Sequence, residues 1–347
     1  MRIRPLASVL RLAASLAGSV AFALMATAGV LQAQSGGAAG APDLTPNSEI
    51  TLVSESNVFR PGTTTTVALR ITMDAGWHTY WTNPGDAGLP LNALWTLPAG
   101  VTVSALRFPT PHVLPVPPLM SFGYEREVFV LADIAVAATL PLGTTLTLAA
   151  DVDFLVCADV CLPASDHVAL TVRTASQPAP TAWAPAIAST RLQLAQPTND
   201  WAATAWRDGA RLTVFARVPA ALRSQLLAPY VIADSVGVLE HAAVQRVRVS
   251  GDTMVLALTL APDFADSTSR FQGVLLTDVA APMSSYQLDI PIVRARPRAA
   301  AGLVATIDGP QAITTGGAAS NASVAVGQSD RAVAATPSFV GASAPAS

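Results

Sequence analysis

Short runs of β-branched and apolar residues recur along most of this chain, separated by Gly, Pro, Asp and Asn. Several runs alternate apolar with polar residues, as 66–71 does, which is the pattern of a strand with one buried face. Regular short strands between turn residues predict an all-β fold of tandem immunoglobulin-like antiparallel β-sandwiches. The predicted strands are 49–54, 64–73, 101–108, 128–136, 145–156, 167–173, 201–207, 211–218, 244–249, 254–260, 271–277 and 286–293, and 220–227 is predicted as one or two helical turns.

A proline-rich stretch divides these strands into two blocks. Prolines at 178, 180 and 185 favour a break in regular structure there. A chain of 347 residues also exceeds what a single hydrophobic core usually supports. The C-terminal residues are rich in Ala, Ser and Gly, so they cannot bury enough apolar surface to offset their ordering entropy. We therefore predict a sandwich at 47–175, a linker at 176–190, a second sandwich at 191–298 and a disordered tail at 299–347.

The N-terminus has the pattern of an export signal. Three arginines precede an uncharged run from 12 to 31 that ends in small residues. We expect a signal peptide at 1–33, cleaved after Ala33 or, as a second candidate, after Ala28, and then a flexible Gly/Ala/Ser linker at 34–46. An uncleaved anchor is the alternative, because about twenty uncharged residues can just cross a bilayer.

No later segment has about eighteen uninterrupted apolar residues, so we expect no membrane span in the mature chain. The expected location is the periplasm or another compartment outside the cytoplasm, where disulfides persist. A formal net charge of −3, no lysine and 12% charged residues argue against nucleic acid as a partner. The sequence has no Gly-rich phosphate loop and no hydrolase or metalloprotease motif, and we predict no cofactor.

The chain has two cysteines, Cys157 and Cys161. In an extended strand their Cα atoms would lie roughly 13 Å apart, whereas a disulfide needs about 4.4–6.8 Å. A strand that ends at Cys157, a turn over 158–160 and a strand that begins at Cys161 would bring the sulfurs together. Closing so short a loop stabilises the fold by only about 2 kcal/mol, against about 4.7 for a hundred-residue loop. A redox pair at an accessible turn therefore explains the spacing better than a disulfide that only stabilises the fold.

Two other interpretations of the pair stay open. An inert local disulfide, or two buried thiols, is the simplest alternative. Two thiolates at this spacing could also hold a soft ion such as Cu(I). None of His78, His112, His167 and His241 lies within four residues of either cysteine, so further metal ligands would have to come through the fold. We predict no metal site.

Aromatic residues gather in two other segments. Residues 76–90 contain Trp77 and Trp81 beside a turn-rich stretch, and we interpret them as sandwich core plus a corner loop. His78 in this segment is interpreted as a polar surface group rather than a catalytic base. A second loop is predicted at 119–127, where an exposed Phe-Gly-Tyr would be costly unless it covers something. A redox disulfide is one candidate for what it covers.

Three motifs occur in order along the first block: Trp77-His78-Thr79-Tyr80-Trp81-x-Asn83-Pro84-Gly85-Asp86-x-Gly88-Leu89-Pro90, Gly123-Tyr124-Glu125, and Val156-Cys157-x-Asp159-Val160-Cys161-Leu162-Pro163. Together they resemble the periplasmic N-terminal domain of the DsbD thiol:disulfide interchange reductases, and most closely the ScsB (suppressor of copper sensitivity) branch. The resemblance covers roughly 45–175, and 190–297 resembles the second domain of that branch more loosely.

The resemblance implies roles for the matched residues. Cys157 and Cys161 would be the catalytic pair, which takes electrons from a membrane-embedded donor and passes them to a periplasmic disulfide-containing protein. Phe122, Gly123 and Tyr124 would form a cap loop that shields the pair. Those relatives continue into a polytopic membrane domain and a thioredoxin-like domain, for which this sequence shows no spans and no Cys-x-x-Cys motif. Its electrons are therefore expected to come from separate proteins, or the module no longer runs the reductase cycle. The resemblance also suggests Cys161 as the exposed cysteine.

The leading hypothesis is therefore an electron-transfer module that acts on protein disulfides, with protein-disulfide reductase activity left open. A non-catalytic binding module with a structural disulfide is the second, and soft-metal handling is the third. Asp159 beside the pair would oppose a thiolate, which predicts low reactivity until a partner docks.

Overall fold

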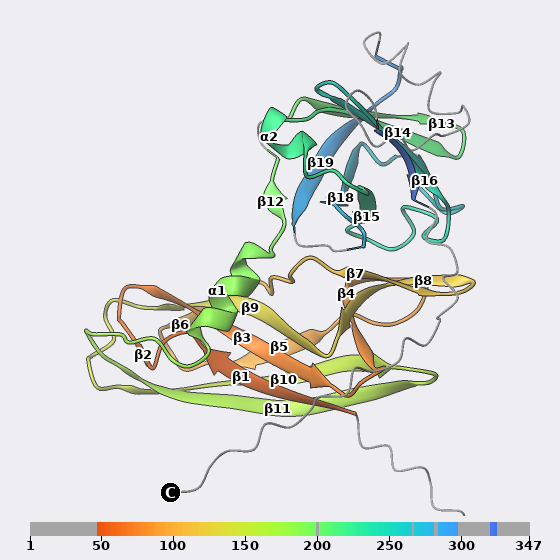
Figure 1. Cartoon of the computed structure of the whole chain (residues 1–347). Helices are drawn as coiled ribbons and strands as arrows, with labels where there is room; N and C mark the ends of the chain where they lie inside the picture. The colour runs from red at the N-terminus through yellow and green to blue at the C-terminus, as the bar shows by residue number, and fades with distance from the viewer. Residues whose placement is uncertain (1–46, 199–200, 266, 281–283, 298–319, 325–347) are drawn as a thin grey trace, which may run out of the picture. The chain divides into compact units, whose positions relative to one another are not determined.

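The computed structural model describes residues 47–198, 201–265, 267–280, 284–297 and 320–324 (Figure 1). The predicted signal peptide at 1–33 and the linker at 34–46 lie outside the described residues. Most of the predicted tail at 299–347 lies outside them too, but its residues Ser320–Val324 form strand β20, which pairs antiparallel with β16. The described residues are mostly strands, as the all-β prediction requires.

The first sandwich consists of two sheets that enclose one core (Figure 1). The four-stranded sheet has the order β1 (Ser48–Ser54), β3 (Thr64–Met73), β9 (Glu127–Val136) and β6 (Val101–Val103). The seven-stranded sheet has the order β2 (Val58–Phe59), β11 (Cys161–Thr174), β10 (Thr145–Cys157), β4 (His78–Gly85), β8 (Leu119–Glu125) and β7 (His112–Val116), with β5 (Asn92–Thr96) paired to β10.

Strand β10 shows why these residues form a sandwich. Its alternate side chains from Leu146 to Val156 are buried, because successive residues of a strand point to opposite faces of the sheet. The buried side chains of β10 share the core with Leu69 and Ile71 of β3 and with Val130 of β9. The apolar face of each sheet is thereby removed from water, which is the main free energy that holds the layers together.

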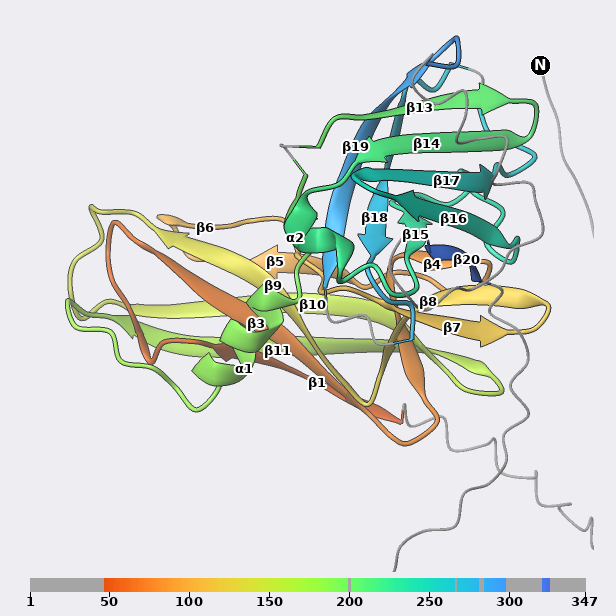
Figure 2. The same ribbon diagram turned by 45° about the horizontal axis from the view of Figure 1, so that its top comes forward.

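The second sandwich is built from one nine-stranded sheet, and Figure 2 shows β13, β14, β17 and β16 side by side. The sheet has the order β15 (Tyr230–Ala233), β18 (Arg270–Leu276), β19 (Ser285–Val293), β13 (Ala203–Asp208), β14 (Arg211–Arg217), β17 (Thr253–Thr259), β16 (Gln245–Ser250) and β20, with β12 (Gln196–Pro197) paired to β19. Its core includes Leu212, Leu256 and Leu275. The predicted helical turn is α2 (Ala220–Arg223).

Helix α1 (Ala184–Leu192) begins inside the stretch predicted as a linker, 176–190, and ends two residues beyond it. Proline near its first turn is compatible with a helix, because the first N–H groups of a helix have no partner within the helix. Ile187 is fully buried in a cluster with Val53, Ala68, Phe129 and Leu131. The proline-rich stretch therefore ends in a helix that packs on β3 and β9 of the first sandwich.

Most predicted strands are present with ends shifted by a few residues, but two segments differ. The predicted corner loop after Trp77 contains β4, and the predicted loop at 119–127 is largely β8. In β8 five consecutive residues are buried, and in β4 six of the eight are. Neither strand therefore has the alternation that identifies a half-buried strand in a sequence.

Candidate functional site

The two cysteines close the end of a long hairpin. Strand β10 ends at Cys157 and β11 begins at Cys161, and the two residues form a disulfide with a Cα–Cα distance of 4.1 Å. In the turn between them, the Ala158 N–H donates a hydrogen bond to the Val160 carbonyl at 3.0 Å. The expected strand, turn and strand arrangement is confirmed. Cys157 and Cys161 are the last register pair of β10 and β11, whose pairing begins at the other end with Thr145 and Arg173.

The two cysteines differ in their access to solvent. Cys157 is 1% exposed, because β4 pairs with β10 at this position. Cys161 is exposed and follows Val160, whose side chain is 59% exposed at the tip of the turn. A reacting group from another molecule can therefore reach the disulfide from the Cys161 side.

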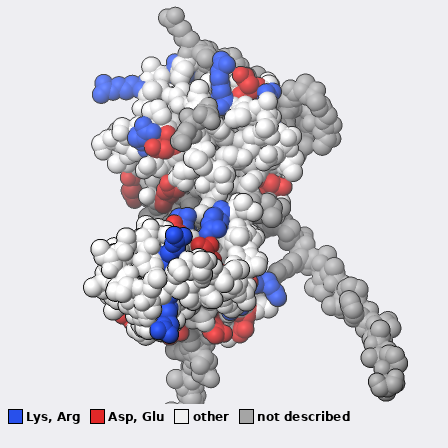
Figure 3. Space-filling model, turned by 90° about the vertical axis from the view of Figure 1, so that its left-hand side faces the viewer, with Lys and Arg blue, Asp and Glu red and all other residues white. Residues whose placement is uncertain are grey.

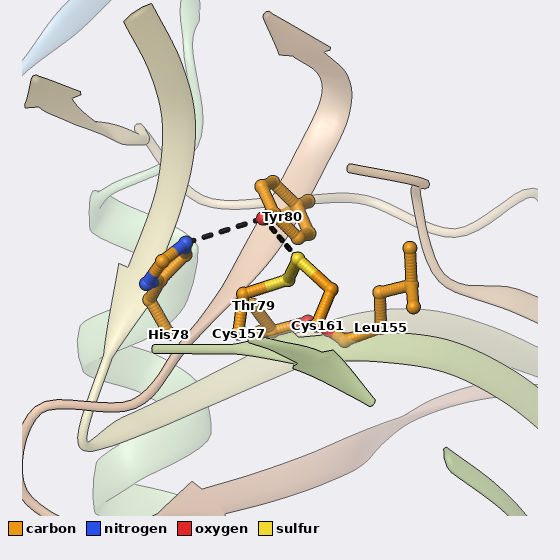
Figure 4. The surroundings of a disulfide bond; sticks show 6 residues. All are labelled: His78, Thr79, Tyr80, Leu155, Cys157 and Cys161. Atoms are coloured by element: carbon orange, nitrogen blue, oxygen red, sulfur yellow. Dashed lines mark hydrogen bonds between the residues drawn. A yellow bond between two sulfur atoms is a disulfide. The ribbon is translucent and has the colours of Figure 1, made fainter. Parts of the chain in front are cut away.

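Strand β4 supplies the polar surroundings of the disulfide (Figure 4). His78 is the register partner of Cys157, and the Thr79 hydroxyl donates a hydrogen bond to the Leu155 carbonyl at 2.9 Å. The Tyr80 hydroxyl lies 3.7 Å from Cys161 Sγ. Because a disulfide sulfur carries no hydrogen, the tyrosine hydroxyl is the donor in this contact.

Tyr80 is held from its other side by Gly88. Tyr80 is 2% exposed, and a Cβ on Gly88 would lie 2.4 Å from its ring carbons. Gly88 also has a φ of +107°, a conformation that residues with side chains rarely adopt. Glycine at this position thus allows the tyrosine ring to pack directly against the backbone while its hydroxyl points to the sulfur.

His78 stands next to Tyr80 in this group. Its Nε2 lies 3.2 Å from the Tyr80 hydroxyl, and the two rings make an edge contact with 5.2 Å between centroids. Burial lowers the pKa of His78, and the negative charge of Glu125 partly opposes this shift. Burial also raises the pKa of Tyr80. At neutral pH the site therefore contains an uncharged imidazole and a protonated phenol.

The predicted cap residues occupy a different environment from the one expected. Phe122, Gly123 and Tyr124 belong to β8, and the two aromatic side chains are 1% and 4% exposed. The Phe122 ring packs edge-on against His241, and the Tyr124 hydroxyl donates to the Pro109 carbonyl at 2.6 Å. The prediction of a loop here was wrong, because these residues form a strand whose two faces are both covered by other parts of the chain. The cap role itself stays a prediction.

The far end of β4 is anchored in the second sandwich. Asn83 is fully buried, and its side-chain amide donates to the Ala233 carbonyl of β15 at 2.8 Å. One residue beyond the strand, the Asp86 carboxylate lies 2.9 Å from His241 Nδ1. The strand that carries Tyr80 is therefore held at one end by the disulfide hairpin and at the other by residues more than a hundred positions later in the chain.

Sequence reasoning did not single out Tyr80, and it interpreted His78 as a polar surface group, whereas the structure places His78 half-buried beside Tyr80. Tyr80 and Cys161 are separated by 81 positions, and nothing in a local pattern reports such a contact. The concentration of aromatic and histidine residues at 76–90 was the available signal, but it was interpreted as core and corner loop. Of the four histidines, His78 is the one paired with a cysteine, whereas His112 is on β7, His167 is on β11 and His241 contacts Asp86.

None of the helices among the described residues has the length and apolar character to span a membrane. No group of three or more His, Cys, Asp or Glu side chains among these residues has an arrangement that would hold a metal ion. On the face in Figure 3, basic and acidic side chains are interspersed between wide uncharged areas rather than gathered by sign.

We predict that reduction of the disulfide leaves the fold intact. The bond joins residues four positions apart, so its loss should lower the free energy of unfolding by only about 2 kcal/mol. Urea unfolding followed by tryptophan fluorescence, with and without dithiothreitol, measures the difference. Unfolding of the protein on reduction in the absence of urea would show instead that the fold depends on the disulfide.

Comparison with known proteins agrees with this geometry. Residues 49–173 match the family described as thiol:disulfide interchange protein DsbD, N-terminal. A comparison with curated protein sequences gives no match.

Among solved structures, the N-terminal periplasmic domain of ScsB from Proteus mirabilis is similar with a TM-score of 0.55 and 17% identity, covering 74% of this chain and 96% of that one. A major pilin subunit, BcpA, of Bacillus cereus aligns with a TM-score of 0.24 and 8% identity over 71% of this chain and 69% of its own. That score is too low to indicate a shared overall fold. The first sandwich, which carries the cysteine hairpin, is thus similar to the DsbD N-terminal domain, and the fold of the chain is similar to that of the ScsB periplasmic domain.

Proposed function

We propose that the Cys157–Cys161 pair exchanges with disulfides or dithiols of partner proteins outside the cytoplasm. The observation that carries this proposal is the asymmetry of the pair, with one buried cysteine, one exposed cysteine and a hydrogen-bond donor directed at the exposed sulfur. Thiol–disulfide exchange needs one accessible sulfur to form the mixed disulfide and a second one close by to resolve it.

The exchange has two steps. When the reduced module acts, the Cys161 thiolate attacks a partner disulfide, so that a Cys161–partner bond forms and the partner's own sulfur–sulfur bond breaks. Cys157 then attacks the Cys161 sulfur, and the intramolecular disulfide forms again as the second partner sulfur leaves. Two electrons pass to the partner. The 4.1 Å between the two Cα atoms keeps the resolving sulfur within reach throughout.

Apolar side chains beside the exposed sulfur support a protein as the partner. Val160 precedes Cys161 and is 59% exposed, and Leu89, which follows the glycine packed on Tyr80, is 61% exposed. Exposed apolar groups around a reactive centre favour contact with another protein surface. The partners that we propose are a membrane-embedded electron donor and an exported disulfide-containing protein, with the periplasm as the location.

The reduction potential of the pair tests this function. Equilibration of the protein with glutathione redox buffers, followed by alkylation and mass spectrometry, measures the fraction reduced. An exchanging pair is expected to have a potential above about −300 mV, because structural disulfides lie below that value. The Cys157→Ser/Cys161→Ser variant gives the baseline. A potential far below this limit would favour the second hypothesis, a binding module whose disulfide only shapes the hairpin.

A further inference from the structure

We propose that Tyr80 and His78 form a proton relay to the exposed sulfur of Cys161. Tyr80 is a catalytic residue in this proposal, because its hydroxyl contacts the reacting sulfur. His78 is a positioning and proton-accepting residue that acts through Tyr80. The inference deepens the proposed exchange function and rests on it.

The geometry forms one continuous chain of contacts. Cys161 Sγ lies 3.7 Å from the Tyr80 hydroxyl, which lies 3.2 Å from His78 Nε2 (Figure 4). A tyrosine hydroxyl can donate and accept at the same time, so the chain can run in either direction. In the disulfide form the hydroxyl donates to sulfur, and His78 Nε2–H donates to the hydroxyl oxygen. In the thiol form the direction reverses, with the thiol donating to Tyr80 and Tyr80 donating to Nε2.

The surroundings of His78 suit its role as the proton acceptor. His78 is uncharged at neutral pH, because burial lowers its pKa, so Nε2 is free to accept a proton. Glu125, its register partner on β8, is the charged group that acts on it and would stabilise the imidazolium once formed. His78 also contacts Tyr80 through its ring and is the register partner of Cys157 on β10. Burial raises the pKa of Tyr80, so the phenol passes a proton on without remaining ionised.

The protons and electrons of one turnover balance. The Cys161 thiol gives its proton to the Tyr80 oxygen, and Tyr80 gives its own proton to His78 Nε2, which leaves a thiolate and an imidazolium. The thiolate attacks the partner disulfide, and the departing partner sulfur takes the proton back from His78 through the same path. Cys157 loses its proton to the second departing sulfur as it attacks Cys161. Two cysteine thiols become one disulfide, and one partner disulfide becomes two thiols.

The test measures how readily Cys161 forms its thiolate. In a Cys157→Ser background, Cys161 is the one remaining thiol, and its rate of alkylation by iodoacetamide is followed against pH. Tyr80→Phe keeps the ring that packs on Gly88 and removes the hydroxyl. We expect it to slow alkylation at pH 7 about tenfold, the effect of a rise of one unit in the thiol pKa. We expect His78→Gln to slow it several-fold and to remove an inflection on the acidic side of the profile.

The double variant distinguishes a relay from two separate contributions. Because His78 reaches the sulfur only through Tyr80, adding His78→Gln to Tyr80→Phe should cause no further slowing, whereas independent effects would multiply. His167→Gln is the matched control, since His167 is an exposed histidine on the same strand as Cys161. It should leave the profile unchanged.

Two results would overturn the relay. The first is an alkylation rate of the Tyr80→Phe variant within about twofold of the rate of the Cys157→Ser protein. A change that small is less than the loss of one hydrogen bond to a charged group would cause. The second is a double variant whose slowing of alkylation equals the product of the slowing caused by Tyr80→Phe and by His78→Gln. Exchange of the unaltered reduced protein with a disulfide-bonded peptide is measured in parallel. If that exchange fails while the variants still alter alkylation, the proposed function is wrong but the relay stands.

Discussion

Cys161→Ser is expected to abolish the capture of a disulfide-bonded peptide, whereas Cys157→Ser is expected to retain the peptide as a mixed disulfide. The reason is access. An attacking thiolate must approach the partner disulfide from outside the protein, and Cys161 is exposed while Cys157 is 1% exposed behind β4. Without Cys157, no neighbouring sulfur can resolve the bond that Cys161 forms, so the complex should persist.

Mass spectrometry of the reduced variants after incubation with the peptide gives the captured fraction directly. The variant that lacks both cysteines is the control for association without a covalent bond. Capture by Cys161→Ser at the level of Cys157→Ser would mean that the hairpin opens enough for the buried cysteine to attack. In that case burial would not determine the order of the two steps.

Gly123→Ala is expected to be among the most damaging single substitutions in the first sandwich. A Cβ at this position would lie 1.9 Å from the Thr79 carbonyl oxygen, and the atoms in its way belong to backbone. Strands β4 and β8 would have to separate, and Tyr80, the register partner of Gly123, would move with β4. We expect a loss of about 3 kcal/mol or more in the free energy of unfolding, at the upper end for overpacked cores.

Gly209→Ala is the matched control. A Cβ there meets nothing within 4 Å, so the cost comes only from its φ of +58° and should be about 1 kcal/mol. Urea unfolding of both variants gives the comparison. An equal loss in the free energy of unfolding for the two variants would show that β4 and β8 can move apart without loss of stability. The placement of Tyr80 would then not depend on their close contact.

The strands that sequence patterns predicted are those with one face buried. Strand β10 alternates along its length because one side faces the core, and that alternation appears directly in the residue order. Strands β4 and β8 lack it. Contacts from the second sandwich cover their other face, such as Asn83 with Ala233 and Phe122 with His241, so buried residues follow one another without interruption. For this reason 119–127 was predicted as a loop, and 76–90 was interpreted as core plus a corner loop rather than as a strand.

For the candidate site, too, local properties could be predicted from the sequence, whereas contacts between distant residues could not. The spacing of Cys157 and Cys161 by itself determined that a bonded pair requires a turn between them and that the bond would add little stability, because both follow from local chain geometry and loop entropy. The family resemblance suggested Cys161 as the exposed cysteine, and the tertiary structure agrees, but the structure alone decided what buries Cys157 and which side chains surround the pair. Those properties depend on β4, whose Tyr80 is 81 positions from Cys161, and contacts at that separation arise only when the sheet assembles and its neighbours exclude water.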